Sequence, residues 1–411
     1  MRARRPRSQS AAFFGADSRL RERYFLHLNM PNPRTNLRTD ARLIVAASDS
    51  DPNLLYATRF FAPDPFIFFQ HRGKKHLVMN DLELDRARRQ ATVDEVLALA
   101  TVESELKERK TRLIDTAAVL RHLFQKRKIH SVLVPSNFPL GLADRLRRLS
   151  VRVMPSVHAF FPEREIKSPD EVRDITRAQR AAEAGMEAAI AMIRESSVSR
   201  GWLYQGAAKL TAEMVRERIV TAAMRHGCLA SHTIVACGEQ GCDPHESGHG
   251  PLRARRSIIL DIFPRSQSSG YWGDITRTIV KGRAAEPIKT LYAAVLAGQS
   301  MALEQIRAGA RGDAIHQTIL NEFERRGFRT GVQNGRMQGF FHGTGHGVGL
   351  EIHELPRLSP RGQAPLRAGH VVTVEPGLYY SGLGGVRLED LVVVSETGFR
   401  NLTRFPKFLE V

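Results

Sequence analysis

The sequence predicts a mixed α/β (α+β) protein, in which a basic amino-terminal tail is followed by two folded domains. Its 411 residues suffice for two domains that each bury a core, and 42% hydrophobic with 25% charged residues is typical of a globular chain. Short apolar runs alternate with amphipathic segments from residue 41 onwards. Dense groups of carboxylates and histidines occur only beyond Ile166. We therefore expect a tail over 1–40, an amino-terminal α/β domain over 41–165 and a chemistry-bearing domain over 166–411.

The first 40 residues are expected to be basic, solvated and partly disordered. The opening MRARRPRSQSAAFFGADSRLRER is rich in arginine and resembles a targeting peptide, but its apolar piece AAFFGA is too short and Asp17 interrupts it. No run of eighteen apolar residues occurs, so we exclude a transmembrane helix and expect no membrane partner. Three cysteines in a chain without a secretory signal predict reduced thiols and a cytoplasmic protein, and a cysteine-only zinc site would need a fourth ligand. These are Cys228, Cys237 and Cys242.

The formal net charge of +18 permits binding to nucleic acid or another polyanion. The arginines are spread through the chain, however, and neither an RNA-binding aromatic motif nor a basic recognition helix accompanies them. An arginine-rich, solvated surface is the favoured interpretation, so nucleic acid is not an expected partner.

The amino-terminal domain is expected to be a small sheet with helices. It contains neither a glycine-rich phosphate loop nor a dense cluster of histidines and acids, so we expect no chemistry there. Its expected roles are dimerisation and closing one side of a cleft. Strands are predicted over 41–47, 65–70, 76–79 and 131–135, and amphipathic helices around 113–124 and 142–149.

The carboxy-terminal domain is expected to begin with a long amphipathic helix. Ser168 is a capping serine, Pro169 occupies the first helical position, and Glu171 follows three residues after the cap. Two helix pairs flank a set of strands, which hints at a duplicated plan. The strands are predicted over 233–237, 257–263, 275–280, 371–374 and 391–394, and the helices over 286–306 and 313–326.

The segment FHGTGHGVGLEIHE, residues 341–354, has the composition of a functional site. It holds three histidines, two glutamates and four glycines among fourteen residues. Glycine at every second position argues against a helix, since each mid-helix glycine costs about 1 kcal/mol relative to alanine. In an extended chain His342 and His346 lie roughly 13 Å apart, at ~3.3 Å per residue, so both cannot hold one metal ion. The alternative is a flexible surface loop.

Carboxylates lie in or beside four strongly apolar runs of this domain. A buried, unpaired carboxylate is costly, so each needs a cationic partner or a metal ion. An arginine partner explains a lone case, but four cases beside a histidine-rich strand favour a metal site. Oxygen ligands with one imidazole suit Mn²⁺, Co²⁺, Fe²⁺ or Zn²⁺, and this many carboxylates can neutralise two divalent ions. They are Asp261 in SIILDIF, Asp274 in GDITRTIV, Glu375 after VVTV, and the neighbours Glu389 and Asp390 in VRLEDLVVV.

Asp261 and Asp274 flank a stretch, DIFPRSQSSGYWGD, that is typical of a hairpin. If its arms pair, the two aspartates meet across it. Thr276 follows Asp274 by two residues on the same strand face, so we expect its hydroxyl to orient the Asp274 carboxylate.

These motifs, in this order, resemble the pita-bread-fold metallopeptidases: Xaa-Pro aminopeptidase, prolidase and their relative methionine aminopeptidase. The resemblance rests on Asp261, DITRT, HGTGHGVGLEIHE, TVEPGLY and GVRLEDLVVV, and it covers residues from Ile166 to the end. It implies a pita-bread catalytic domain. The amino-terminal domain resembles, in size and strand pattern only, the creatinase-like domain that precedes it in the proline-specific branch.

The resemblance also implies roles for individual residues. Residue types alone leave His342 and His346 equivalent, and likewise Glu389 and Asp390; the resemblance selects His346 and Glu389. The implied metal ligands are Asp261, Asp274, His346, Glu375 and Glu389, with Asp274 and Glu389 bridging two ions. His342, His353 and Arg387 match residues that line the substrate pocket, and so does His245 in CDPHES, for which a surface loop is the alternative.

The chemistry implied by the resemblance is hydrolysis of the peptide bond before proline. Two divalent ions, Mn²⁺ first and Co²⁺, Zn²⁺ or Fe²⁺ after it, are the implied cofactors. Glu375 is the implied proton carrier, and His342 and His353 the other catalytic groups. The expected partners are a peptide or dipeptide with proline after the scissile bond and a second copy of the chain. The alternatives are a related hydrolase or lyase acting on a non-peptide substrate, and a catalytically silent RNA-binding protein.

Overall fold

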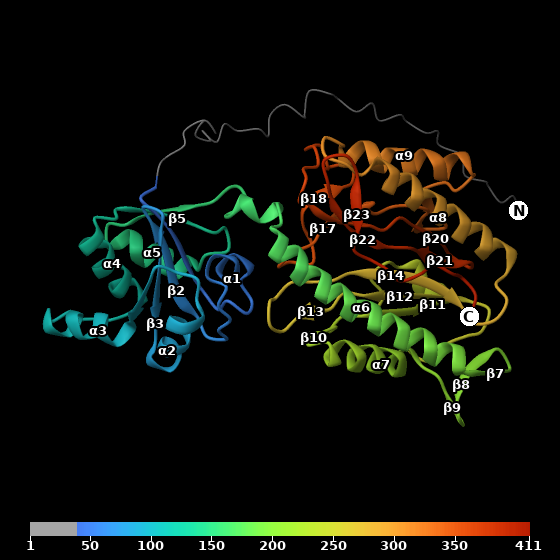
Figure 1. Cartoon of the computed structure of the whole chain (residues 1–411), viewed down its shortest axis with the longest axis horizontal. Helices are drawn as coiled ribbons and strands as arrows, with labels where there is room; N and C mark the ends of the chain where they lie inside the picture. Colours follow the sequence, from blue (N-terminus) through green and yellow to red (C-terminus); the bar gives the residue numbers. More distant parts are fainter. Residues whose placement is uncertain (1–38) are drawn as a thin grey trace, which may run out of the picture.

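The computed structural model describes residues 39–411, and Figure 1 shows them as two bodies that lie side by side along the long axis. The predicted basic tail lies almost wholly outside these residues. The amino-terminal body meets the carboxy-terminal one close to the start of helix α6 (Pro169–Glu195). The boundaries at 40 and 165 stay predictions. Within the described residues, every helix is too short or too polar for a bilayer crossing.

The amino-terminal body is built on one mixed sheet of six strands in the order β4-β3-β2-β1-β5-β6. β1–β2 and β2–β3 pair antiparallel, whereas β3–β4, β1–β5 and β5–β6 pair parallel. The strands are β1 (Ala41–Ala46), β2 (Phe66–His71), β3 (Lys74–Met79), β4 (Glu95–Ala98), β5 (Ser131–Val134) and β6 (Arg152–Pro155).

Alternating side chains put a hydrophobic core on each face of this sheet. Leu43 and Phe69 face one core with α3 (Leu99–Glu108), α4 (Thr116–Arg127) and α5 (Leu140–Arg148). Their neighbours Ile44 and Phe68 face the other core with α1 (Pro52–Thr58) and α2 (Asp81–Gln90). The four predicted strands and both predicted helices are confirmed, whereas α1, α2, α3, β4 and β6 were not predicted.

Helix α6 begins as the sequence predicted. The side chain of Ser168 accepts from the backbone N–H of Glu171, and the Glu171 side chain accepts from the backbone N–H of Ser168, which forms a capping box. Figure 1 shows α6 running across the carboxy-terminal body, with α7 (Ala212–Arg225) beside it.

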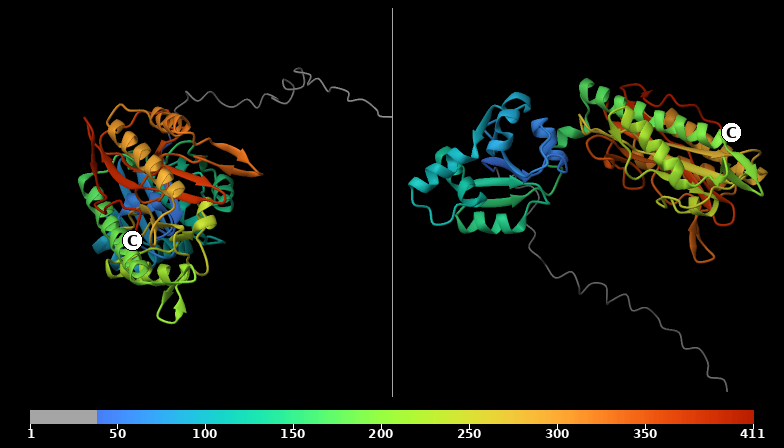
Figure 2. Two further views of the ribbon diagram at one scale, coloured as in Figure 1. Left: turned by 90° about the vertical axis from the view of Figure 1, so that its right-hand side faces the viewer. Right: turned by 90° about the horizontal axis from the view of Figure 1, so that it is seen from below.

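The carboxy-terminal body places its sheets between two helix pairs. α6 and α7 share a core with the sheet β11-β12-β14, and α8 (Glu286–Gln305) and α9 (Gly312–Arg325) share another with the sheet β18-β17-β19-β22-β23. The end-on view in Figure 2 shows the two pairs on opposite sides of the strands. This agrees with the duplicated plan suggested by the sequence.

All five strands and both later helices predicted for this body are present. The main strands are β11 (Ile234–Cys237), β12 (Ser257–Ile262), β14 (Ile275–Val280), β17 (Gly345–Gly347), β18 (Glu354–Leu358), β19 (Val371–Val374), β22 (Asp390–Val394) and β23 (Phe399–Asn401). The short strands are β7 (Ser197–Ser199), β8 (Trp202–Gln205), β9 (Ala208–Lys209), β10 (Cys228–Leu229), β13 (Arg265–Ser266), β15 (Gly331–Gln333), β16 (Arg336–Gln338), β20 (Gly377–Tyr380) and β21 (Gly384–Arg387).

Candidate metal centre and active-site cavity

A cavity of about 820 Å³ opens in the carboxy-terminal body, and it gathers every site residue that the sequence singled out. The predicted metal ligands and the predicted substrate-binding residues both line this cavity, although they come from loops and strands spread over more than 140 residues of sequence. The predicted metal ligands at its wall are Asp261, Asp274, His346, Glu375 and Glu389, and the predicted substrate groups are His245, His342, His353 and Arg387.

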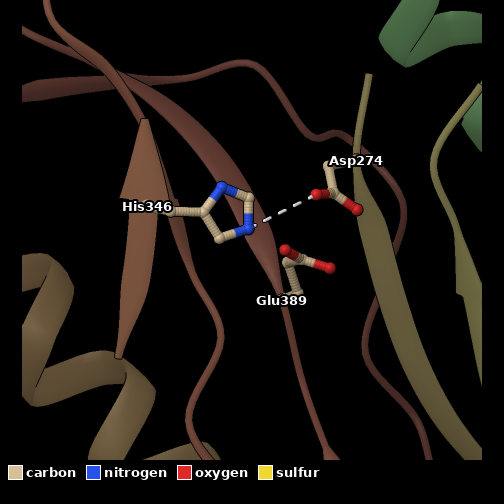
Figure 3. Close-up of side chains that lie close together, drawn as sticks. All are labelled: Asp274, His346 and Glu389. Atoms are coloured by element: carbon tan, nitrogen blue, oxygen red, sulfur yellow. Dashed lines mark ion pairs between the residues drawn. The ribbon is translucent and has the colours of Figure 1, made fainter. Parts of the chain in front are cut away.

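Three of the five predicted ligands form a compact cluster. Asp274, His346 and Glu389 each offer one ligand atom, and these atoms all lie within 4.8 Å of one another. Figure 3 shows the imidazole of His346 directed at Asp274, with Nε2 3.8 Å from Oδ2, and Glu389 below them. His346 lies on β17, while Asp274 and Glu389 immediately precede β14 and β22. Two hard oxygen donors with one imidazole are a set that first-row divalent ions accept.

The other two predicted ligands lie beside this cluster with partners of their own. Oδ2 of Asp261 accepts from Nη2 of Arg387 at 2.6 Å. Oε1 of Glu375 lies 3.1 Å from Nε2 of His346 and accepts from the Thr373 hydroxyl at 3.1 Å. Four carboxylates thus meet one guanidinium and one imidazole at this wall of the cavity.

This excess of negative charge changes the acidity of the carboxyl groups. Burial, followed by the charges of Glu389, Asp261 and Glu375, raises the pKa of Asp274 well above its usual value. Burial and the charges of Glu375 and Asp261 do the same to the pKa of Glu389. Burial also acts to raise the pKa of Glu375, but the hydrogen bond with His346 and nearby positive charge outweigh it and lower that pKa to about 2. A divalent cation would relieve the repulsion, so the residues fit a metal ion.

The scaffold explains why Glu389, and not its neighbour Asp390, faces the cavity. Asp390 is 1% exposed and points into the core, where Arg277 Nη2 donates to it at 2.9 Å and Lys407 Nζ at 2.5 Å. The carboxylate of Glu389 turns the other way and accepts from the Thr276 hydroxyl at 2.8 Å. The prediction that Thr276 orients Asp274 was therefore wrong, because Glu389 is the carboxylate that approaches the hydroxyl from the neighbouring segment.

Asp274 is held through its backbone. The Gln179 side chain, on α6, accepts from the Asp274 N–H at 2.7 Å and donates to its carbonyl at 2.9 Å. β12 and β14 pair antiparallel as expected, with Asp261 opposite Thr276. The stretch between them is more than a simple hairpin, since β13 leaves it to pair with β10.

Glycines in the histidine-rich segment allow three chain segments to pack closely. A side chain at Gly345 would collide with the carbonyl of Thr373 on β19, and one at Gly347 with the carbonyl of Leu355 on β18. The extended conformation that the sequence predicted is present at β17. His346 is thereby fixed between two neighbouring strands.

A hydrogen-bonded chain runs along the substrate side of the cavity. Nδ1 of His342 lies 2.8 Å from the carbonyl of Gly343 and therefore carries the proton, so Nε2 accepts from the Tyr379 hydroxyl at 2.8 Å. That hydroxyl accepts in turn from Arg387 Nη1 at 2.9 Å. Burial lowers the pKa of His342 to about 4, which leaves the ring neutral at pH 7. Tyr379, at the end of TVEPGLY, had no role assigned from the sequence.

His353 stands edge-on to His346, with ring centroids 4.3 Å apart and an interplanar angle of 89°. Burial, then the charge of His346, lowers its pKa to about 4. His245 lies on an exposed loop and also lines the cavity, so its two predicted locations are compatible. Sequence reasoning missed two arginines of the lining, Arg357 on β18 and Arg361 just after it.

Comparisons with known proteins agree with this geometry. Residues 173–396 match the model of metallopeptidase family M24. The chain is 32% identical over 281 residues to the Xaa-Pro dipeptidase of Pyrococcus horikoshii, which covers 67% of this chain and 74% of that protein. It is 34% identical over 244 residues to the Xaa-Pro dipeptidase of Pyrococcus furiosus, covering 59% of this chain and 64% of that protein.

A solved structure shares the fold over both bodies. The X-Pro aminopeptidase of Thermotoga maritima superposes with a TM-score of 0.76 at 23% identity, covering 91% of this chain and 98% of that one. The predicted α/β class and pita-bread fold are thus confirmed. The chain belongs to metallopeptidase family M24 and is a metal-dependent peptidase with the pita-bread fold.

Proposed function

We propose that this metallopeptidase hydrolyses the peptide bond before proline with two divalent ions, Mn²⁺ being the first candidate. The observation that carries the proposal is the meeting of four carboxylates and one imidazole at the wall of one cavity, beside neutral histidines and a buried arginine. The oxygen-rich donor set favours Mn²⁺ over softer ions. The residues that would hold the ions are Asp261, Asp274, His346, Glu375 and Glu389.

The ions, when bound, supply Lewis acidity that activates water and polarises the scissile carbonyl at neutral pH. The protein groups around them handle the proton. Glu375 lines the cavity next to His346, and its free oxygen is the site that takes up the proton from water and returns it to the leaving nitrogen.

The substrate side of the cavity supplies donors for the peptide. His353 and His342, both neutral at pH 7, would position the scissile carbonyl and the proline ring. Arg387 is 3% exposed and Tyr379 bonds it to His342, so it would act as a fixed cation for a backbone carbonyl or carboxylate. His245 approaches from the exposed rim of the cavity.

A dipeptide is the substrate that the cavity supports best. Arg357 and Arg361 line it, and neither makes an ion pair with an acid among residues 39–411. Two guanidinium groups at a cavity wall favour a ligand with a free carboxylate. A longer Xaa-Pro peptide is the second candidate, because a further cavity of about 470 Å³ between the two bodies shares His353 and Arg357 with the first and offers room for more residues.

Substrate length and metal choice can be tested together. Metal-free protein is loaded in turn with Mn²⁺, Co²⁺, Zn²⁺ or Fe²⁺ and assayed on Ala-Pro, Ala-Pro-Ala and Ala-Ala. We expect Ala-Pro to be cleaved fastest with Mn²⁺ and Ala-Ala to be inert. Preference for Ala-Pro-Ala would make the enzyme an aminopeptidase. No cleavage with any ion would contradict the proposal and direct attention to a non-peptide amide or a lyase reaction.

We also propose a cytoplasmic homodimer. The three cysteines are free thiols, which suits a reducing compartment. Light scattering on the purified full-length chain measures the oligomer, and a monomeric mass would contradict the second part of this proposal.

A further inference from the structure

The loop that carries His353 is tied at both ends to other parts of the site. It spans residues 348–353, between β17 and β18. The backbone N–H of Trp272, two residues before Asp274, donates to the carbonyl of Gly349 at 3.0 Å, and the Trp272 indole donates to the carbonyl of Leu350 at 3.2 Å. At its other end the loop passes through His353 directly into Glu354, the first residue of β18.

The carboxylate of Glu354 joins this loop to two cations. Nζ of Lys167 donates to one oxygen and Nη2 of Arg164 to the other, the latter at 3.0 Å. The three side chains are largely shielded from water, with exposures of 10% for Glu354, 1% for Lys167 and 11% for Arg164. The carboxylate also lies over Gly349, where any side chain would collide with it. The Glu354 side chain therefore packs against Gly349, near the other end of the same loop, while it binds both cations.

Both cations belong to the segment that connects the two bodies. Arg164 lies on the 3₁₀ turn η2 (Pro162–Glu165), and its Nη1 donates to the Asn53 side chain of α1 at 2.9 Å. Lys167 precedes α6, and its backbone N–H donates to the carbonyl of Gly369. Hydrogen bonds therefore lead from the amino-terminal body through Arg164 to Glu354, which directly follows His353 in the sequence.

The cavity between the bodies follows the same path. Asn53, Arg164 and Glu354 line it, and it meets the active-site cavity at His353 and Arg357. We therefore expect a substitution of Glu354 to affect first the two side chains that line both cavities, His353 and Arg357.

We propose that Glu354 is a positioning residue. Clamped by Arg164 and Lys167, it holds the 348–353 loop so that His353 stands edge-on to His346 at the substrate, and it makes the connecting segment part of the active site. The consequence for turnover rests on the proposed peptidase function; the effect on the loop does not. Glu354 itself touches neither the proposed metal ligands nor the substrate side chains already described.

Three variants separate positioning from bulk stability. Glu354→Gln keeps the shape and removes the charge, but it leaves Lys167 buried without its partner. The double variant Glu354→Gln with Lys167→Met removes the charges of Glu354 and of Lys167. We expect it to fold even if the single variant does not. Glu351→Gln is the matched control, because Glu351 lies on the same loop and also accepts from Arg164, at 2.8 Å, but is 48% exposed.

The first readouts need no substrate. We expect amide hydrogen exchange in residues 348–353 to speed up at least about tenfold in Glu354→Gln and in the double variant, and to stay unchanged in Glu351→Gln. Mn²⁺ titrated into the metal-free proteins should bind all three with wild-type affinity within about threefold, since the ligands are elsewhere. The proposal would be overturned if hydrogen exchange in the loop were unchanged in the Glu354 variants. It would also be overturned if their Mn²⁺ affinity fell as the exchange became faster.

Turnover of Ala-Pro gives the second test. We expect kcat to fall about 10- to 100-fold in Glu354→Gln with KM within about threefold, because a displaced His353 weakens contacts made in the transition state. In a His353→Ala background the same substitution should have no further effect. A full additional loss there would show that Glu354 does not act through His353. If the wild-type protein cleaves no Xaa-Pro substrate, the proposed function fails, while hydrogen exchange still decides the role of Glu354.

Discussion

One carboxylate of the amino-terminal body and two carboxylates at the cavity of the carboxy-terminal body meet opposite surroundings. In the amino-terminal body, Glu105 receives hydrogen bonds from Lys126 and His122, and these lower its pKa to about 2. At the cavity of the carboxy-terminal body, burial and neighbouring acids push the pKa of Glu389 and of Asp274 upwards. Protein cations already neutralise the first kind of carboxylate, whereas the second kind still requires a cation from outside. The contrast separates an acid whose charge the protein itself compensates from acids that form a candidate metal site.

The largest expected effect comes from removing one of the proposed metal ligands. Glu389→Ala should lower kcat/KM for Ala-Pro by at least about 10⁴-fold, which corresponds to ~5 kcal/mol of transition-state free energy. The metal-free variant should unfold at or above the wild-type temperature, because one repelling charge has gone. Steady-state kinetics and calorimetry measure the two effects. Normal turnover would remove Glu389 from the metal site.

The neighbouring acid should give the reverse result. Asp390→Asn breaks a buried ion pair with Arg277, so the free energy of unfolding should fall by about 3 to 5 kcal/mol. Mn²⁺ affinity, measured below the unfolding transition, should change little because Asp390 faces the core. Denaturant unfolding checks the first value. A variant as stable as wild type that no longer binds Mn²⁺ would exchange the roles of Glu389 and Asp390.

Metal binding should stabilise one body and not the other. At a free Mn²⁺ concentration about 100-fold above its Kd, the free energy of unfolding of the carboxy-terminal body should rise by ~2.7 kcal/mol. Hydrogen exchange should slow in β14, β17 and β22 and stay unchanged in β1 and β5. In the control variant Glu389→Ala, we expect Mn²⁺ to change neither the free energy of unfolding nor the hydrogen exchange. Equal protection of both bodies would show that the metal acts outside the proposed site.

The smallest expected effect concerns pH in the amino-terminal body. The folded-state pKa of Glu105 is depressed to about 2, so its stabilising contribution is present above the unfolded pKa of ~4.3 and is lost as pH falls towards 2. Its side chain is 36% exposed, so solvent screening limits the contribution to at most about 1 kcal/mol. Glu105→Gln should therefore be slightly less stable than wild type at pH 7 and equal to it near pH 2. An equal difference at both pH values would assign the effect to packing.

The strands of the core could be predicted because local sequence determines them. β12 is an apolar run around a single acid, β14 is a run rich in β-branched residues directly after Asp274, and the Ser168 capping box marks the start of α6. Helix α7 was missed although Val215, Ile219 and Ala223 repeat at helical spacing. Strand β13 consists of only two residues, and its partner β10 lies far earlier in the sequence, so no local pattern predicts it.

The site was accessible from the sequence only with help from the family resemblance. Residue chemistry alone left Glu389 and Asp390 equivalent. What distinguishes them is Arg277, more than 100 residues earlier, which takes Asp390 into the core. Arg357 and Arg361 carried no signal, since single arginines are common in this chain. Their location in the cavity depends on the course of β18.

Arg277 also sets the order in which a newly made chain can complete this centre. Its side chain donates to the carbonyl of Glu389 and to the carbonyls of Phe405 and Pro406. A polypeptide leaves the ribosome amino end first, so Asp261 and Asp274 emerge long before these last anchors. The hydrogen bonds that fix Arg277 beside Glu389 can therefore be completed only after residue 406 has been released, whereas an ion that binds before Glu389 emerges meets only part of the proposed donor set.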